Sequence, residues 1–175
     1  MVRNELNPHP EMESQLAALF GSLEEATRDS RSDLLDMLAD PKAITWQPFE
    51  DGHSVGTILL HIIDVEAWWI SECGAGIPRT DEEKKRFLSE ETQQGKEIWP
   101  TSPDMPIEWF FEQHDIIRKR SAKIVAKWID QNQEISVRDH VITTGWLLAH
   151  VTAHEAYHYG QSMLLLMLYN RQVGK

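Results

Sequence analysis

The sequence predicts an all-α protein, an up-and-down four-helix bundle with a long crossover between its second and third helices. Four long stretches place apolar residues at three- and four-residue steps, which is the period of an amphipathic helix. A charged connection with three prolines separates the second stretch from the third, and no stretch shows the strong alternation of a strand. With 175 residues and 41% hydrophobic content, the chain suits one compact domain over residues 1–175.

The first predicted helix runs from about Glu11 to Ala39 and ends before Pro41, whose ring cannot continue it. Small polar groups at Thr27 and Ser30 interrupt its apolar stripe. The stripe comprises Met12, Leu16, Leu19, Leu23, Leu34 and Leu38.

The second predicted helix runs from about Ser54 to Cys73, because Ser54 is a suitable N-cap and glycines follow at 74 and 76. Its stripe comprises Val55, Ile58, Ile62, Val65 and Trp69. The connection from Gly74 to Pro103 comes next, and its charged part predicts a short helix from about Asp81 to Thr92. A connection of this length usually crosses the end of a bundle or shapes a site.

The third predicted helix runs from about Pro106 to Asp130, and the fourth runs from Asp139 or His140 to Tyr169. The apolar face of the third comprises Ile107, Phe110, Phe111, Ile117, Ile124, Val125 and Trp128. Between these two helices, the segment EISVRD (residues 134–139) favours one short extended piece.

The composition restricts the partners and the compartment of the protein. A net charge of -11 repels phosphate backbones and argues against nucleic acid, and we interpret residues 118–120, the densest basic run, as a solvated helix face. Cys73 is the sole cysteine and no apolar leader begins the chain, which favours the reducing cytoplasm. The longest apolar run, Met163 to Tyr169, is too short to span a membrane.

The fourth helix contains His154, Glu155 and His158 in the order H-E-x-x-H, in which two histidines share one helix face and can hold one metal. A zinc protease needs a third ligand, and the chain after His158 contains no His, Asp, Glu or Cys. The third ligand must therefore lie upstream, and His61 on the buried side of the second helix is the leading candidate. Three imidazoles could then hold a divalent cation with open coordination positions.

Other residues near this pattern have two interpretations each. Glu155 is a candidate catalytic base by analogy with H-E-x-x-H, but its rotation of about 100° from His154 could turn it to a neighbouring helix. His150 is expected to have a structural role or to orient a ligand ring, with direct ligation of the metal as the alternative, and His114 is expected to be a hydrogen-bonded core histidine. Asp64 could orient a ligand imidazole or face solvent. The tryptophans at 68, 69 and 146 could line a pocket mouth, although core packing is the more ordinary role.

Two segments, Trp46 to Trp69 and Trp146 to Leu166, resemble the DinB-like superfamily of metal-binding four-helix bundles. The resemblance places the family's histidines at His61, His154 and His158, followed by the pair Gly160-Gln161. It implies a three-histidine site for nickel, zinc, iron or manganese, and a low-molecular-weight thiol such as bacillithiol or mycothiol as cofactor. Tyr157 and Tyr159 depart from the family, since many relatives carry His and Arg there.

Three functions follow as hypotheses. The first is a metal-dependent thiol S-transferase acting on a small-molecule substrate, and the second is a hydrolase that uses metal-bound hydroxide. The third is a non-catalytic metal-binding stress protein. A carboxylate within reach of the metal would favour the hydrolase, whereas a fourth ligand such as His114 or His150 would favour the non-catalytic protein. The oligomeric state stays open, with a homodimer as one option.

Overall fold

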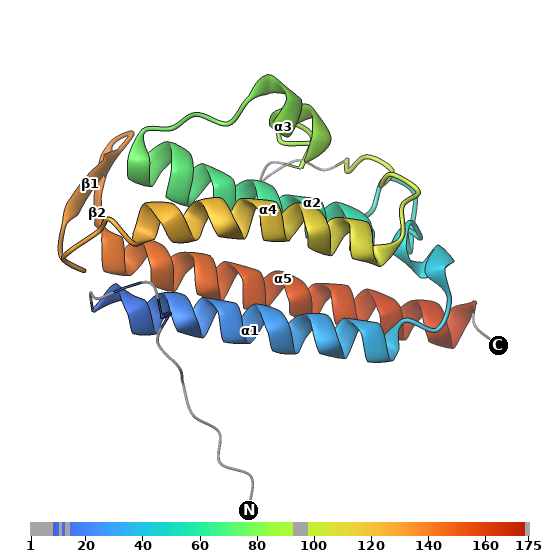
Figure 1. The fold of residues 1–175 in the computed structure, drawn as a ribbon. Coiled ribbons are helices and arrows are strands. Elements are labelled where there is room, and N and C mark those ends of the chain that lie inside the picture. Colours follow the sequence, from blue (N-terminus) through green and yellow to red (C-terminus); the bar gives the residue numbers. More distant parts are fainter. Residues whose placement is uncertain (1–8, 11, 13–14, 93–97, 174–175) are drawn as a thin grey trace, which may run out of the picture.

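The computed structural model describes residues 9–10, 12, 15–92 and 98–173, and it is mostly helical (Figure 1). Its long helices fall close to the predicted positions, and a small two-stranded sheet accompanies them. The elements in chain order are α1 (Leu16–Met37), the 3-10 helix η1 (Pro41–Ile44), α2 (Val55–Glu66), the π-helix η2 (Ala67–Cys73), α3 (Asp81–Arg86), α4 (Ile107–Val125), β1 (Glu134–Val137), β2 (His140–Thr143) and α5 (Thr144–Gln172).

The long helices lie side by side along one axis (Figure 1). Helix α5 packs against both α1 and α2, and α2 also packs against α4. The predicted long crossover is present between α2 and α4, and it returns the chain to the end of the molecule at which α2 begins. As a result α2 and α4 run in the same direction, opposite to α1 and α5, instead of alternating strictly up and down.

Two hydrophobic clusters fill the space between the helices. The first is built mainly on α2 and reaches α4, the far half of α5 and the crossover, while the second joins α1 to η2 and the start of α5. Leu16 and Leu23 of the predicted α1 stripe are fully buried in the second cluster, together with Phe20, which the prediction did not include. The helical periodicity therefore identified the buried face of α1 correctly, because packing on neighbouring helices needs a continuous apolar stripe.

Several predicted boundaries were wrong. Residues 140–143, expected to begin the last helix, form β2 and pair with β1 in an antiparallel hairpin with Val137 opposite His140. The run Val-Ile-Thr favours extended backbone, and Thr143 accepts a hydrogen bond from Trp146 N and so starts α5 one residue later. Helix α1 begins at Leu16 instead of Glu11; part of the predicted first turn lies outside the described residues.

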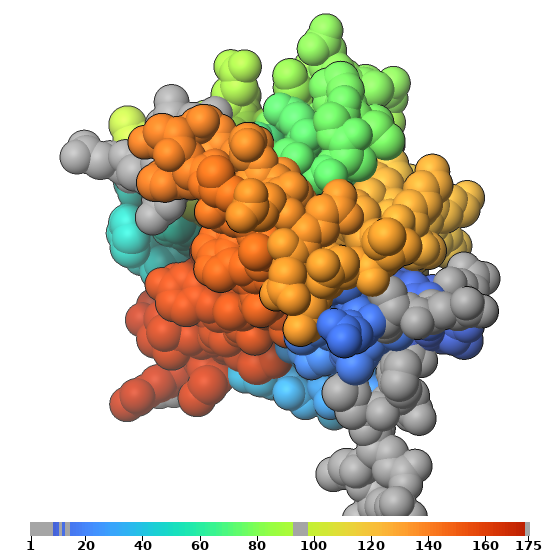
Figure 2. All heavy atoms as spheres, turned by 90° about the vertical axis from the view of Figure 1, so that its left-hand side faces the viewer, coloured from blue at the N-terminus to red at the C-terminus, as the bar shows by residue number. Residues whose placement is uncertain are grey.

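The crossover and the end of α4 also differ in length from the prediction. Helix α3 stops at Arg86, although helix was expected to Thr92, and Leu88 shortly after it has a positive φ of 55° that ends regular helix. Helix α4 stops at Val125 instead of Asp130. The hairpin that follows, with the adjoining turns, covers this end of the molecule (Figure 2).

The second predicted helix has a well-defined start and an unusual end. Ser54 and Thr57 form a capping box, in which Ser54 Oγ accepts from Thr57 N and the Ser54 N–H donates to Thr57 Oγ1. Its last turns are the π-helix Ala67–Cys73, a form that often occurs at functional sites. Across the described residues, no helix has both the length and the apolar character needed to cross a membrane.

Candidate metal centre

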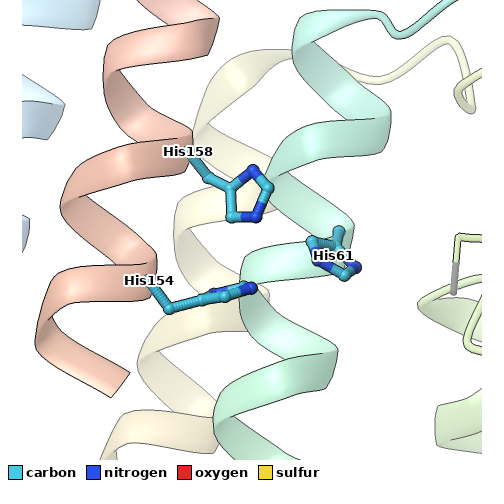
Figure 3. A group of neighbouring side chains, drawn as sticks. All are labelled: His61, His154 and His158. Atoms are coloured by element: carbon cyan, nitrogen blue, oxygen red, sulfur yellow. The ribbon is translucent and has the colours of Figure 1, made fainter. Parts of the chain in front are cut away.

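Three histidine side chains from two helices meet between α2 and α5, with His61 buried and His154 and His158 half-buried. His61 of α2 and His154 and His158 of α5 point toward one another (Figure 3). One ring nitrogen from each lies within 4.8 Å of the others. The ring centroids are 5.1 Å apart for His61 and His154, 4.8 Å for His61 and His158, and 4.3 Å for His154 and His158. The structure thus brings together the three residues that the sequence singled out.

Local structure explains why these rings converge. His154 and His158 are one helical turn apart on α5, so both side chains leave the helix on the same face. His61 lies in the middle of α2, whose start is set by the Ser54 capping box, and α2 packs directly on α5. Two regular helices therefore hold all three ligand candidates, which gives better control of position than loops would.

The ring nitrogens suit a metal. Gln161 Oε1 lies 2.7 Å from His158 Nδ1 and accepts its hydrogen bond, which leaves Nε2 of His158 free to ligate. The Thr92 backbone, near the His61 ring, slightly opposes the lowering of the pKa of His61. His154 Nδ1 is buried and has no hydrogen-bond partner among the described residues. A buried imidazole nitrogen without a partner is costly, and coordination to a cation would satisfy such a ring.

All three imidazoles are held in the neutral form that metal ligation requires. Burial, with further contributions from His158 and His53, lowers the pKa of His61 to about 4. Burial, with further contributions from His158, His61 and His150, lowers the pKa of His154 to about 3. Burial also lowers the pKa of His158, against the opposing hydrogen bond to Gln161. At neutral pH the rings therefore present lone pairs, and no proton must leave before a cation binds.

Sequence reasoning missed His53 and Trp99, which border the site. The ring centroids of His53 and Trp99 are 3.7 Å apart, and those of Trp99 and His61 are 5.5 Å apart. His53 is close enough to lower the pKa of both His61 and His158. It lies in the loop that precedes α2, where no periodicity indicates direction, so its only sequence signal was its position next to the Ser54 cap.

Glu155, the candidate base, lies away from the three histidines in a second buried cluster. Its carboxylate accepts hydrogen bonds from Arg118 Nη2 at 2.6 Å and Thr27 Oγ1 at 2.7 Å. His114 is a buried core histidine, as expected, and its Nε2 lies 2.9 Å from Glu66 Oε2. Arg118 was expected on a solvated face, and that expectation was wrong because the Glu66 and Glu155 carboxylates draw its guanidinium inside.

The remaining candidates lie around the site without joining it. Asp64 is buried, so the solvent-facing interpretation was wrong, and its hydrogen-bond partners are Arg79 and Ser89. The His150 ring stacks on the Trp146 ring, with centroids 4.7 Å apart, and its centroid lies 4.9 Å from that of Trp69. Its ring centroid is 6.2 Å from that of His154, and it is not part of the three-nitrogen group.

The fold and the site together define a class of protein: mostly helical, with three histidines from two helices converging on one point. This is the arrangement that the resemblance to DinB-like proteins implied. A family model described as "Mycothiol-S-transferase" matches residues 18–166. The chain therefore belongs to the mycothiol S-transferase family, which is part of the DinB/YfiT-like superfamily. No curated protein matches the chain.

Proposed function

We propose that this protein is a metal-dependent thiol S-transferase that holds one divalent cation through His61, His154 and His158. The observation that carries the proposal is the convergence of three neutral imidazoles inside a chain of the mycothiol S-transferase family. Its thiol substrate would be mycothiol, the thiol for which the family is named, and its second substrate a small electrophile.

The donor set supports a transition metal with room for a substrate. Imidazole nitrogens suit nickel, zinc and iron better than calcium or magnesium. Three protein ligands leave coordination positions open, as in catalytic and unlike closed structural sites. When bound, the cation would supply a Lewis-acid centre that lowers the pKa of a coordinated thiol.

The chain's own thiol is unsuited to act as the nucleophile. Burial and the nearby Glu72 carboxylate raise the pKa of Cys73 to about 11, so it is protonated at neutral pH. An external thiol is therefore needed, which agrees with the family. The residues of the site would orient the cation and exclude water, with Gln161 fixing the His158 ring.

The hydrolase and the non-catalytic protein are weaker candidates. Within the described residues, the three-histidine group contains no carboxylate, and Glu155 is already bonded to Arg118 and Thr27. The two candidate fourth ligands have other partners, Glu66 for His114 and Trp146 for His150. These contacts support a site that keeps open positions and lacks a nearby carboxylate base.

The test compares the wild type with His154→Ala and with His140→Ala, whose histidine lies exposed on the hairpin. Elemental analysis should find about one metal per chain in the wild type and in His140→Ala, and little in His154→Ala. Transfer of mycothiol to a fluorogenic bimane halide should follow the same order, since the proposed chemistry needs the cation.

Cysteine in place of mycothiol serves as the control for thiol specificity in this assay. Full metal content in His154→Ala would contradict the ligand assignment. If the wild type binds metal but transfers neither thiol, the metal site is supported and the proposed transferase function is contradicted.

A further inference from the structure

A second polar cluster lies in the middle of the molecule, separate from the three histidines. It takes one or two side chains from each of the four long helices, and every one of them is at least nine-tenths buried. These side chains are Thr27 of α1, Glu66 of α2, His114 and Arg118 of α4, and Glu155 of α5. The function proposed above uses none of them.

Arg118 is the centre of this cluster. Its Nε and Nη2 donate to the Glu66 carboxylate at 3.0 Å each, and Nη2 also donates to Glu155 Oε1 at 2.6 Å. Its Nη1 donates to Thr27 Oγ1 at 3.2 Å, and Thr27 Oγ1 lies 2.7 Å from Glu155 Oε2. One guanidinium therefore connects α1, α2 and α5 through directional hydrogen bonds.

The charges in the cluster favour these contacts. Two carboxylates surround one guanidinium, and His114 contacts Glu66 at 2.9 Å and Glu155 at 3.5 Å. Although burial opposes it, the two carboxylates raise the pKa of His114 above its ordinary value, and a protonated His114 would balance the second carboxylate. Oxygen and nitrogen atoms of Glu66, His114 and Glu155 lie within 4.8 Å of one another, but the guanidinium already fills the position of a cation.

The cluster is joined to the metal-ligand candidates along the chain. Glu155 directly follows His154 on α5, and Glu66 lies five residues after His61 on α2. Because adjacent residues on a helix are about 100° apart, His154 can face α2 while Glu155 faces α1 and α4. Any rotation of α5 that moved the His154 ring would also break the bonds of Glu155.

We propose that this ionic cluster is a positioning device for the metal centre, in which Arg118 holds Glu66 and Glu155 so that α2 and α5 present their histidines to one point. The inference rests on the proposed function, because it needs the three histidines to bind metal. Apolar side chains between α2 and α5 would allow small rotations and slides, whereas hydrogen bonds to one guanidinium depend on direction. Ligand atoms must be placed to within a few tenths of an ångström for tight metal binding.

The test measures cobalt(II) binding by visible absorption, which reports both the dissociation constant and the coordination geometry. Glu155→Leu removes the bonds of α5 to Arg118 and Thr27 but leaves the Arg118–Glu66 pair neutral and intact. Glu155→Gln keeps the shape and one carbonyl acceptor for Arg118. We expect the dissociation constant to rise by about 10- to 100-fold in Glu155→Leu, with altered cobalt bands, and by less in Glu155→Gln.

Leu166→Ala is the matched control, because Leu166 is fully buried on the same helix, about three turns beyond Glu155, in the first hydrophobic cluster. It should lower the melting temperature while its cobalt bands and affinity stay as in the wild type. Folded Glu155 variants with wild-type affinity and bands would overturn the positioning role alone, as would equal changes in Leu166→Ala. A wild type that binds no cobalt would overturn the metal site itself, and the positioning role with it.

Discussion

Two adjacent residues of α5 show how the environment decides the chemistry of a side chain. His154 lies with His61 and His158, whereas Glu155 lies with Arg118 and Thr27. In a zinc protease the same H-E-x-x-H letters place the glutamate next to the metal-bound water. Here the Glu155 carboxylate has Arg118 as its partner instead. The two histidines of the motif therefore lie as metal-ligand candidates, but its glutamate is not placed as a base.

The pH dependence of metal binding should reveal the buried state of these histidines. With the pKa of His61 near 4 and that of His154 near 3, both rings stay neutral well below pH 6 in the folded protein. We expect protonation of His61 and His154 to reduce metal affinity little between pH 7.5 and about 5 and more below that, whereas exposed imidazoles would lose affinity from about pH 6.5 downward. Calorimetric titration in buffers of different ionisation enthalpy should detect almost no proton release from these two ligands at pH 6.

The lowered pKa values of His61 and His154 also make the free energy of unfolding of the metal-free protein depend on pH. The folded-state pKa values lie below the unfolded value of about 6.5, so the unfolded chain binds more protons between about pH 6.5 and 4. The free energy of unfolding should therefore fall as the pH drops through this window. A steep loss of metal affinity that starts near pH 6.5 would contradict the buried, neutral rings.

At the scale of the element, α2 is positioned by a close contact at its first turn. Gly56 faces the crossover, and a Cβ at this position would lie 2.8 Å from Ser102 Cβ and 2.0 Å from Ser102 Oγ. Ser102 is itself buried, so it has little room to move. Because Gly56 has no side chain, the crossover at Ser102 can approach the start of α2 closely. This contact sets the position of α2, and with it His61, relative to the crossover.

Two glycine substitutions in helices should therefore have opposite effects. Gly160 lies in α5, and a Cβ there would meet no atom within 4 Å. Gly160→Ala should raise the free energy of unfolding by about 0.5–1 kcal/mol, because alanine loses less backbone entropy in a helix. Gly56→Ala should lower it by about 1–2 kcal/mol, since the clash outweighs that gain. Urea denaturation of both variants measures the difference, and stabilisation by Gly56→Ala would disprove the close contact.

At the scale of the whole molecule, the net charge of -11 bears on the partners of the protein. The largest favourable term in nucleic-acid binding is the release of counterions by basic side chains. In the basic run at residues 118–120, Arg118 is buried against two carboxylates and is out of reach of phosphate, and Arg120 is paired with Glu83. The structure thus weakens this basic patch.

We expect no complex with duplex DNA of dissociation constant below about 1 μM at about 0.15 M salt. Fluorescence anisotropy of a short labelled duplex provides the measurement, with metal-loaded and chelated protein tested in parallel. Binding that is tighter than this and weakens with rising salt would contradict the expectation.

The sequence by itself determined the helices, the long crossover and the three histidines that meet. These features depend on local signals: a 3.6-residue apolar period, an N-cap at Ser54 and a four-residue spacing of His154 and His158. Each signal is set within one turn or one helix, so a single sequence is enough to read it, whereas the approach of His61 on α2 to the two histidines of α5 depends on packing between the helices. The coordination of a metal by the three histidines stays a prediction.

Only the tertiary structure decided which partners the buried charges have. Thr27 and Glu155 are 128 positions apart and Arg118 is 52 positions from Glu66, yet they share one cluster. Such contacts depend on how each helix is rotated relative to its neighbours. The apolar period of a single helix does not predict that rotation. The π-helical end of α2 and the approach of His53 to the site have the same origin, because packing outweighs weak local preference there.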